Sequence, residues 1–400
     1  MICIAAITLS TADQALFSYA IPSIIEEFDL DLEVIGQILS LSFLVASFAI
    51  IAVGLIADFW GRRRVFVATL ALSAVFVGLH GMADNLGWLT VFRALGFAIA
   101  AGLYPVTNTI LIEVAPARYR GMVGWLQIGY PIGFFVASLI AAPLIDTYGW
   151  RSVFLPAFLV VPLAFILGRL LKETSRFKQV SANPVQTKKR PSIRQHMGEL
   201  FTQKLWRRTV GCFVGSFLIS LAIGITTYFI PTYFVQDRGL AESTAALLVG
   251  SSYAVGVVGY LLATYIGEFV TTRRNALILW VWLGAVVFFG TVWFTATPLW
   301  LTVGYACSVM FLFGSEAIRM PMISELFPTR IRTTATVMCG SLAVTTAWLI
   351  GPLVFTAAVS RVGWTMAFTV FAVLPLVLGG AAFLMLQNVA SGLEVEEISS

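Results

Sequence analysis

The sequence predicts an all-helical membrane protein with twelve spanning helices, built as two parallel six-helix repeats. Two observations lead to this fold class. Of the 400 residues, 59% are hydrophobic and only 11% are charged, whereas ordinary globular domains are about 25% charged. The apolar residues also gather in runs near the length of about 20 residues that a helix needs to cross a bilayer. A soluble enzyme is therefore excluded, and no room is left for a sizeable water-soluble domain.

Each apolar run is interpreted as one spanning helix. The first begins at the start of the chain, with no basic leader and no small-residue cleavage site, so we expect a helix rather than a signal peptide. Whether this helix is truncated upstream is left open. The runs cover 2–24, 34–57, 65–84, 88–112, 122–145, 150–171, 209–235, 243–266, 276–297, 299–323, 334–358 and 363–387.

One long basic segment separates the sixth run from the seventh. It covers 172–208, and its Pro184 and Pro191 oppose a continuous helix. We therefore expect an N-terminal six-helix bundle over 1–171, a cytoplasmic linker over 172–208, and a C-terminal six-helix bundle with a short tail over 209–400.

The distribution of Lys and Arg predicts the orientation of the chain. Of the 25 such residues, only Arg151, Arg238 and Arg361 fall in loops on the side opposite the linker, and Arg93 and Arg319 fall inside helices. All others lie in the linker, its adjoining helix end, or loops on its side. Because cytoplasmic loops carry the excess of Lys and Arg, we expect both termini in the cytoplasm and the protein in the inner or plasma membrane.

An internal repeat supports the two halves. The pattern E-x-x-P-x-R-x-R runs from Glu113 to Arg120 and again from Glu325 to Arg332, at an offset of 325 − 113 = 212. Two further echoes pair Gly149-Trp150 with Gly363-Trp364, and Asp58, Arg63 and Arg64 with Glu268, Arg273 and Arg274. A duplicated unit with an even number of helices implies a parallel repeat, with a cavity between the halves.

The loop after the second run carries a motif with a readable physical logic. Gly54 permits close approach of helices, and Asp58 at a helix end can accept charge-assisted hydrogen bonds. Arg62 and Arg63 follow Gly61, where they can hold the loop in the cytoplasm and contact neighbouring helix ends. An ordinary basic loop is the alternative reading.

This spacing of a glycine, an aspartate and Gly-Arg-Arg resembles the signature loop of the major facilitator superfamily. Phe59 stands where that family usually has a basic residue. The resemblance implies a gating role on the cytoplasmic side for Gly54, Asp58, Gly61, Arg62, Arg63, Glu113, Arg120, Glu268, Glu325 and Arg332.

Further strings resemble the sugar-porter and the aromatic-acid/metabolite:proton symporter branches of that family. They include Arg93-Ala94-Leu95-Gly96, the string from Gly149 to Phe154, and Tyr228-Phe229-Ile230-Pro231-Thr232. The resemblance implies secondary active uptake of a small organic carboxylate, with aromatic acids as one class, by alternating access with protons.

Four ionisable residues lie within predicted helices, where such groups are usually functional. Asp13 is about halfway along the first helix, and Arg93 lies about 7 Å inside the fourth, at 1.5 Å per residue. In the resembling symporters, an acid and an arginine at these positions couple proton movement to transport. The alternative is a static buried ion pair that only specifies packing.

The other two, Glu316 and Arg319, are candidates for substrate binding, because a guanidinium pairs with a carboxylate through two hydrogen bonds. Three residues apart, they can also neutralise each other within the helix. Further candidate wall residues, each of which can instead pack between helices or sit in the interface belt, are Tyr104, Asn108, Gln127, Tyr130, Tyr228 and Trp348.

Other functional classes find little support. The only histidines, His80 and His196, do not suggest a metal site, and no phosphate-binding loop is present. We therefore expect no cofactor, no catalysis and no nucleic acid, and a monomer whose partners are an organic anion, protons and the lipid bilayer. A sugar or polyol symporter, a drug antiporter and a non-transporting sensor remain alternatives, and the substrate stays open.

Overall fold

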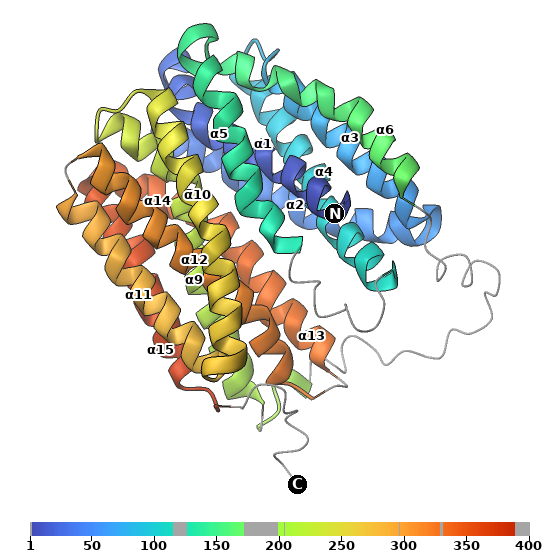
Figure 1. Cartoon of the computed structure of the whole chain (residues 1–400), viewed down its shortest axis with the longest axis vertical. Coiled ribbons are helices and arrows are strands. Elements are labelled where there is room, and N and C mark those ends of the chain that lie inside the picture. Colours follow the sequence, from blue (N-terminus) through green and yellow to red (C-terminus); the bar gives the residue numbers. More distant parts are fainter. Residues whose placement is uncertain are drawn as a thin grey trace. The chain divides into compact units, whose positions relative to one another are not determined.

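The computed structural model describes residues 2–114, 126–171, 199–203, 205–295, 297–328 and 331–388 (Figure 1). These residues are helical almost throughout and contain no strand. The helices of the first half are α1 (Ile2–Phe28), α2 (Leu32–Trp60), α3 (Arg62–His80), α4 (Leu86–Val114), α5 (Gly129–Tyr148), the short η2 (Trp150–Val153) and η3 (Leu155–Leu159), and α6 (Val160–Leu170).

The second half repeats this scheme with more irregular turns. Its elements are α9 (Trp206–Gln236), α10 (Glu242–Tyr265), η4 (Ile266–Val270), α11 (Arg273–Phe294), α12 (Pro298–Glu325), α13 (Arg332–Thr336), η5 (Val337–Leu342), α14 (Ala343–Phe368), η6 (Thr369–Val373) and α15 (Leu374–Leu384).

Among the described residues, eleven helical segments are long and apolar enough to cross a bilayer. The last of them, Thr334–Leu384, is 51 residues long, or about 77 Å at 1.5 Å per residue, against about 30 Å for a hydrocarbon core. Its backbone breaks at Gly363, where φ is 78° and ψ is 168°. The segment is therefore two spans, and the predicted all-helical fold with twelve spanning segments is confirmed.

The repeat seen in the sequence is also present in the backbone. Gly149, between α5 and η2, has φ 76° and ψ 166°, almost the same values as Gly363, its partner at an offset of 214. Trp150 packs on Phe154 with ring centroids 6.1 Å apart, and Trp364 packs on Phe368 at 6.0 Å. The same short motif thus makes the same turn in both halves of the sequence.

The described chain divides into two compact units. The first comprises Met1–Thr187 with Tyr228–Ser251, and the second comprises Lys188–Thr227 with Ser252–Ser400. The start of α10 and the end of α9 therefore belong with α1 to α6.

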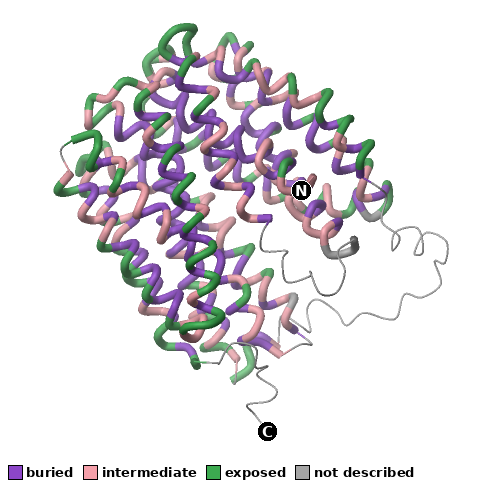
Figure 2. The backbone as a smooth tube through the Cα atoms, viewed as in Figure 1, coloured by how far each residue is buried: buried purple, intermediate pink, exposed green. Residues whose placement is uncertain are grey.

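In the first unit, α1 packs against α4 and α5, and α3 packs against α4 and α6. Every residue of α1 from Ser10 to Pro22 is buried, which makes it the central helix of this unit (Figure 2). A side chain from its middle is consequently enclosed by protein on all sides. In the second unit, α11 packs against α12 and α15.

Candidate functional site

A buried ion pair joins α1 and α4 inside the first unit. The nearest guanidinium nitrogen of Arg93 lies 3.6 Å from a carboxylate oxygen of Asp13, and their side chains are 0% and 4% exposed. Neither group makes a hydrogen bond to the described residues. A direct N–H···O bond is about 2.7–3.2 Å long, so the two charges attract each other without being joined by one.

Aromatic rings surround the guanidinium of Arg93. Its central carbon lies 4.3 Å from the ring centroid of Phe17 and 5.1 Å from that of Phe97. A cation over an aromatic face is worth about 2 kcal/mol when it is desolvated. The rings therefore offset part of the free-energy cost of burying this charge. Arg93 consequently depends less on Asp13 for its stabilisation than it would in surroundings of pure hydrocarbon.

His80 lies beside this cluster at the end of α3. The imidazole is fully buried, and its ring packs on Phe17 and Phe154 at centroid distances of 6.0 and 5.0 Å. Its Nδ1 lies 3.0 Å from the carbonyl oxygen of Val77. His80 is not among the predicted site residues, because nothing in the sequence shows that α3 turns it towards Arg93.

Gln14, the neighbour of Asp13, forms a polar junction with two of the predicted wall residues. Its carbonyl oxygen accepts hydrogen bonds from the hydroxyls of Tyr130 at 3.0 Å and Tyr228 at 3.1 Å. The backbone carbonyl of Tyr228 in turn accepts a 2.9 Å bond from Ser18 on α1. Gln14 was not among the predicted site residues, although an amide in the middle of an apolar helix was a usable signal.

The other predicted wall residues of the first unit, Tyr104, Asn108 and Gln127, are half-buried. Along α4, Arg93 and Phe97 are buried, whereas Tyr104 and Asn108 are half-buried. Tyr104 packs against the apolar cluster of α1, α3, α4 and α6. Gln127 is half-buried in the short turn before α5.

Arg319 and Glu316 form a second ion pair, in the second unit. A guanidinium nitrogen of Arg319 lies 2.5 Å from the carboxylate of Glu316, and the Arg319 side chain is fully buried. Its other terminal nitrogen donates to the carbonyl of Ser216 at 2.9 Å and the hydroxyl of Ser220 at 2.6 Å, both on α9. Trp348 on α14 also reaches α9, with its indole nitrogen 3.1 Å from the carbonyl of Ser220. The pair is thus part of a junction between three helices.

Glu316 is the more accessible member of this pair. Its side chain is 22% exposed, while one of its carboxylate oxygens has no hydrogen-bond partner in the described part of the chain.

Gly61, Arg62 and Arg63 shape the loop after α2. Gly61 ends α2 and begins α3 with φ 92°, and Arg63 donates a 2.6 Å bond to the carbonyl of Gly168 in the last turn of α6. Arg62 lies 3.5 Å from the carbonyl of Ala57. The space around Gly54 is open in the described structure, so these residues do not show the close helix approach expected there.

The equivalent region of the second unit contains a three-residue charge cluster. Arg273 pairs with Glu268 at 2.5 Å and also with Glu325, which joins η4, α11 and α12. Arg274 donates to the carbonyl of Leu384 at the end of α15. This contact matches the one that Arg63 makes with the carbonyl of Gly168 near the end of α6. Arg332 lies 3.5 Å from the carbonyl of Phe327.

Some of the residues predicted to form the cytoplasmic gate lie outside the part of the chain that the structure describes. Arg120 and most of the linker, 172–198, lie outside the described residues, and the side chains of Asp58 and Glu113 do as well.

Twelve apolar spans, an internal repeat and two buried ion pairs are the features of a polytopic membrane transporter. The chain belongs to the Major Facilitator Superfamily, whose model matches residues 3–338. The resemblance found in the sequence is confirmed, and the chain is a multi-pass membrane transporter rather than an enzyme.

The relatives and structures similar to this chain are transporters too. It is 28% identical to the cis,cis-muconate transport protein of Acinetobacter baylyi, over 82% of this chain and 80% of that one. It is 26% identical to the 4-hydroxybenzoate transporter PcaK of the same organism, over 84% of this chain and 79% of that one. The crystal structure of a D-xylose-proton symporter matches with a TM-score of 0.78 at 16% identity, covering 98% of each chain, which is a likeness of fold.

Proposed function

We propose that this chain takes up a small organic carboxylate, with aromatic acids as one class, together with protons and by alternating access. The observation that carries the proton coupling is the buried pair of Asp13 and Arg93, whose charged groups lie 3.6 Å apart with no hydrogen bond between them. The substrate class is supported by two relatives named for the organic acids cis,cis-muconate and 4-hydroxybenzoate.

In the proposed cycle, Asp13 takes up a proton from outside, which releases Arg93 from its charged partner. The substrate carboxylate then engages Arg319, the two halves rock about the site, and loss of the proton to the inside restores the pair. The proton gradient supplies the driving force, and the membrane potential adds about 2.3 kcal/mol per charge per 100 mV.

At the substrate end, we propose an exchange of carboxylates on Arg319. The hydrogen bonds from Arg319 to Ser216 and Ser220 hold the guanidinium in place, while Glu316 is partly exposed and has an unmet oxygen. A substrate carboxylate replaces Glu316 and keeps the buried arginine neutralised. The proposed walls of the substrate cavity are Tyr104, Asn108, Gln127, Tyr130, Tyr228 and Trp348.

The charged residues of the two equivalent loops are proposed as the cytoplasmic gate, with both termini on that side and the protein acting as a monomer in the inner membrane. The contacts that support a gate are those at helix ends, from Arg63 to Gly168 and from Arg274 to Leu384. Such contacts brace two helix ends in one state and can be broken in another.

A sugar or polyol:proton symporter is the second candidate. It is favoured by the direct pairing of Arg319 with Glu316, because an arginine that is already neutralised suits a neutral substrate as well as an anion. In that case Arg319 is a structural link between α9 and α12.

A thermal-stability screen of the detergent-purified protein tests these two candidates against each other. The panel contains 4-hydroxybenzoate, cis,cis-muconate, aliphatic acids, D-xylose and cationic drugs, with Arg319→Ala in parallel. A ligand at a hundredfold excess over its Kd stabilises by about 2.7 kcal/mol. A shift with carboxylates that the variant loses supports the proposal, whereas a shift with sugars alone overturns it.

A further inference from the structure

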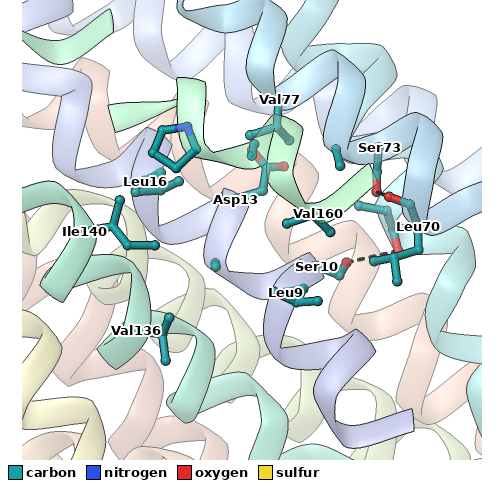
Figure 3. A pocket seen from close by; sticks show the side chains of 15 residues that line it. Leu9, Ser10, Asp13, Leu16, Leu70, Ser73, Val77, Val136, Ile140 and Val160 are labelled. Carbon is teal, nitrogen blue, oxygen red and sulfur yellow. Dashed lines mark hydrogen bonds between the residues drawn. The ribbon is translucent and has the colours of Figure 1, made fainter. Parts of the chain in front are cut away.

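A cavity of about 70 Å³ lies inside the first unit, beside Asp13 (Figure 3). Its walls come from α1, α3, α4, α5, η3 and α6, and most of the lining side chains are apolar. The polar ones are Ser10 and Asp13 on α1 and Ser73 on α3. Because Ser10 and Asp13 are three residues apart, they share one face of α1.

The carboxylate of Asp13 lacks hydrogen-bond partners where it borders this cavity. Both oxygens are buried and make no hydrogen bond to the described residues, although an ionised carboxylate offers about four acceptor positions. Buried polar groups in proteins are nearly always paired with protein or with ordered water. The guanidinium of Arg93 is 3.6 Å away, too far for a hydrogen bond, which leaves the carboxylate in need of another donor.

Ser10 and Ser73 can accept hydrogen bonds from a molecule bound in the cavity. Ser10 donates its proton towards the carbonyl of Ala100 at 3.4 Å, and Ser73 donates to that of Leu70 at 3.1 Å. Their hydroxyl oxygens therefore keep acceptor lone pairs. A water molecule has two protons and can bridge Asp13 to either serine. Since a water occupies about 30 Å³ in the liquid, the cavity has room for about two.

We propose that this cavity is a water-binding site that hydrates Asp13 and exchanges protons with it. A protonated water in the site transfers its proton to a carboxylate oxygen, leaving neutral water and a neutral carboxyl group, and the reverse step returns the proton. The proton itself comes from the aqueous phase. Of the other ionisable groups, Arg93 on α4 lies 3.6 Å from Asp13, and His80 on α3 packs on Phe17, the ring that Arg93 also contacts. The helices α5, η3 and α6 contribute only apolar side chains to the wall.

This site is distinct from the proposed substrate cavity, because its lining contains neither Arg319 nor any of the proposed wall residues of that cavity. The inference deepens the proposed function, since it gives Asp13 a proton donor that does not depend on bound substrate. Its first test, however, needs no substrate at all.

That test is radiolytic labelling of the full chain in detergent with ¹⁸O-water, read by mass spectrometry. Water held in the cavity gives the buried side chains of Leu16, Leu70 and Val77 labelling rates at least fivefold above those of Ile24 and Leu103, which are as buried but do not line it. Equal rates in the two groups mean a dry cavity and overturn the proposal.

Cavity-filling variants complete this test. We expect Ser73→Leu to remove the excess labelling. If leucine is too large for the protein to fold, Ser73→Val is used instead, with the same expected result. The matched control is Ser42→Leu on α2, also a buried serine bonded to a carbonyl one turn back but not part of the cavity. Excess labelling that persists in both Ser73 variants contradicts a site at this position.

A second readout links the water to transport. In proteoliposomes, Ser73→Val slows uptake of 4-hydroxybenzoate driven by a pH gradient at least tenfold, while exchange at equal pH stays within twofold of the wild type. Unchanged gradient-driven uptake overturns the role in proton transfer. If the wild type moves no organic acid, the proposed function fails while the labelling result still decides the water site.

Discussion

Asp13 and Arg93 lie 3.6 Å apart in the interior of the first unit, and neither makes a hydrogen bond to the described residues. The pair is attracted by charge but is not locked by directional bonds, and Phe17 and Phe97 stabilise the arginine from other sides. Neutralising Asp13 therefore leaves Arg93 with favourable contacts of its own. This arrangement suits a reversible protonation better than a hydrogen-bonded buried pair, whose disruption costs about 3–5 kcal/mol.

Replacement of Glu316 tests the proposed exchange of carboxylates on Arg319. Glu316→Gln removes the competing charge, so we expect the affinity for 4-hydroxybenzoate to rise about tenfold, or about 1.4 kcal/mol. Arg319→Gln abolishes binding. Isothermal titration in detergent measures both, and the far-ultraviolet circular dichroism of each variant serves as the folding control. Weaker binding of the acid by Glu316→Gln than by wild type contradicts the exchange.

The two equivalent glycines provide a test of the repeat. Gly149 and Gly363 have φ near 77° and ψ near 167°, a region essentially restricted to glycine, where a side chain costs about 1–3 kcal/mol. Gly149→Ala and Gly363→Ala should each lower the unfolding temperature in detergent, by similar amounts.

Gly290→Ala is the matched control for these variants, because Gly290 lies within α11 and a Cβ there meets no other atom within 4 Å. Alanine at a helical position is neutral or slightly stabilising. An equal loss of stability in the control would show that the loss does not come from the backbone conformation.

The junction at Gln14 predicts an energetic coupling between α1 and α9. Tyr228 is fully buried and donates to Gln14, so Tyr228→Phe should cost about 0.5–1.5 kcal/mol. In Gln14→Leu the tyrosine has already lost this acceptor, and the further change to Phe should cost less. A double-mutant cycle on thermal unfolding measures the difference, and additive effects would mean that the hydrogen bond does not contribute.

The sequence predicted the fold well because composition, run length and repetition are properties of the whole chain. Hydropathy alone is enough to predict the twelve spanning segments. The repeated Gly-Trp string marks a turn that recurs in the structure with nearly the same dihedral angles. The pairing of Asp13 with Arg93 was anticipated from the resemblance to symporters with an acid and an arginine at these positions, and because ionisable residues within membrane helices usually pair with one another.

The surroundings of that pair could not be predicted in the same way. The packing of His80 on Phe17 and the hydrogen bonds of Gln14 with Tyr130 and Tyr228 depend on how α1 and α3 are rotated about their axes, which is set by packing among many helices. The involvement of Ser216 and Ser220 with Arg319 is similar, because serines in apolar helices are common and usually bond to their own backbone. For Arg319, the sequence favoured substrate binding and kept structural pairing as the alternative, and the structure adds its contacts with α9.

The central claim is that a proton moves with an organic acid through Asp13. The most direct measurement is accumulation of 4-hydroxybenzoate in proteoliposomes under an inward pH gradient, with proton entry recorded by an internal dye. We expect the wild type to accumulate the acid and admit protons with it, and Asp13→Asn to lose both while keeping exchange at equal pH. Accumulation by Asp13→Asn at the wild-type level would contradict the account.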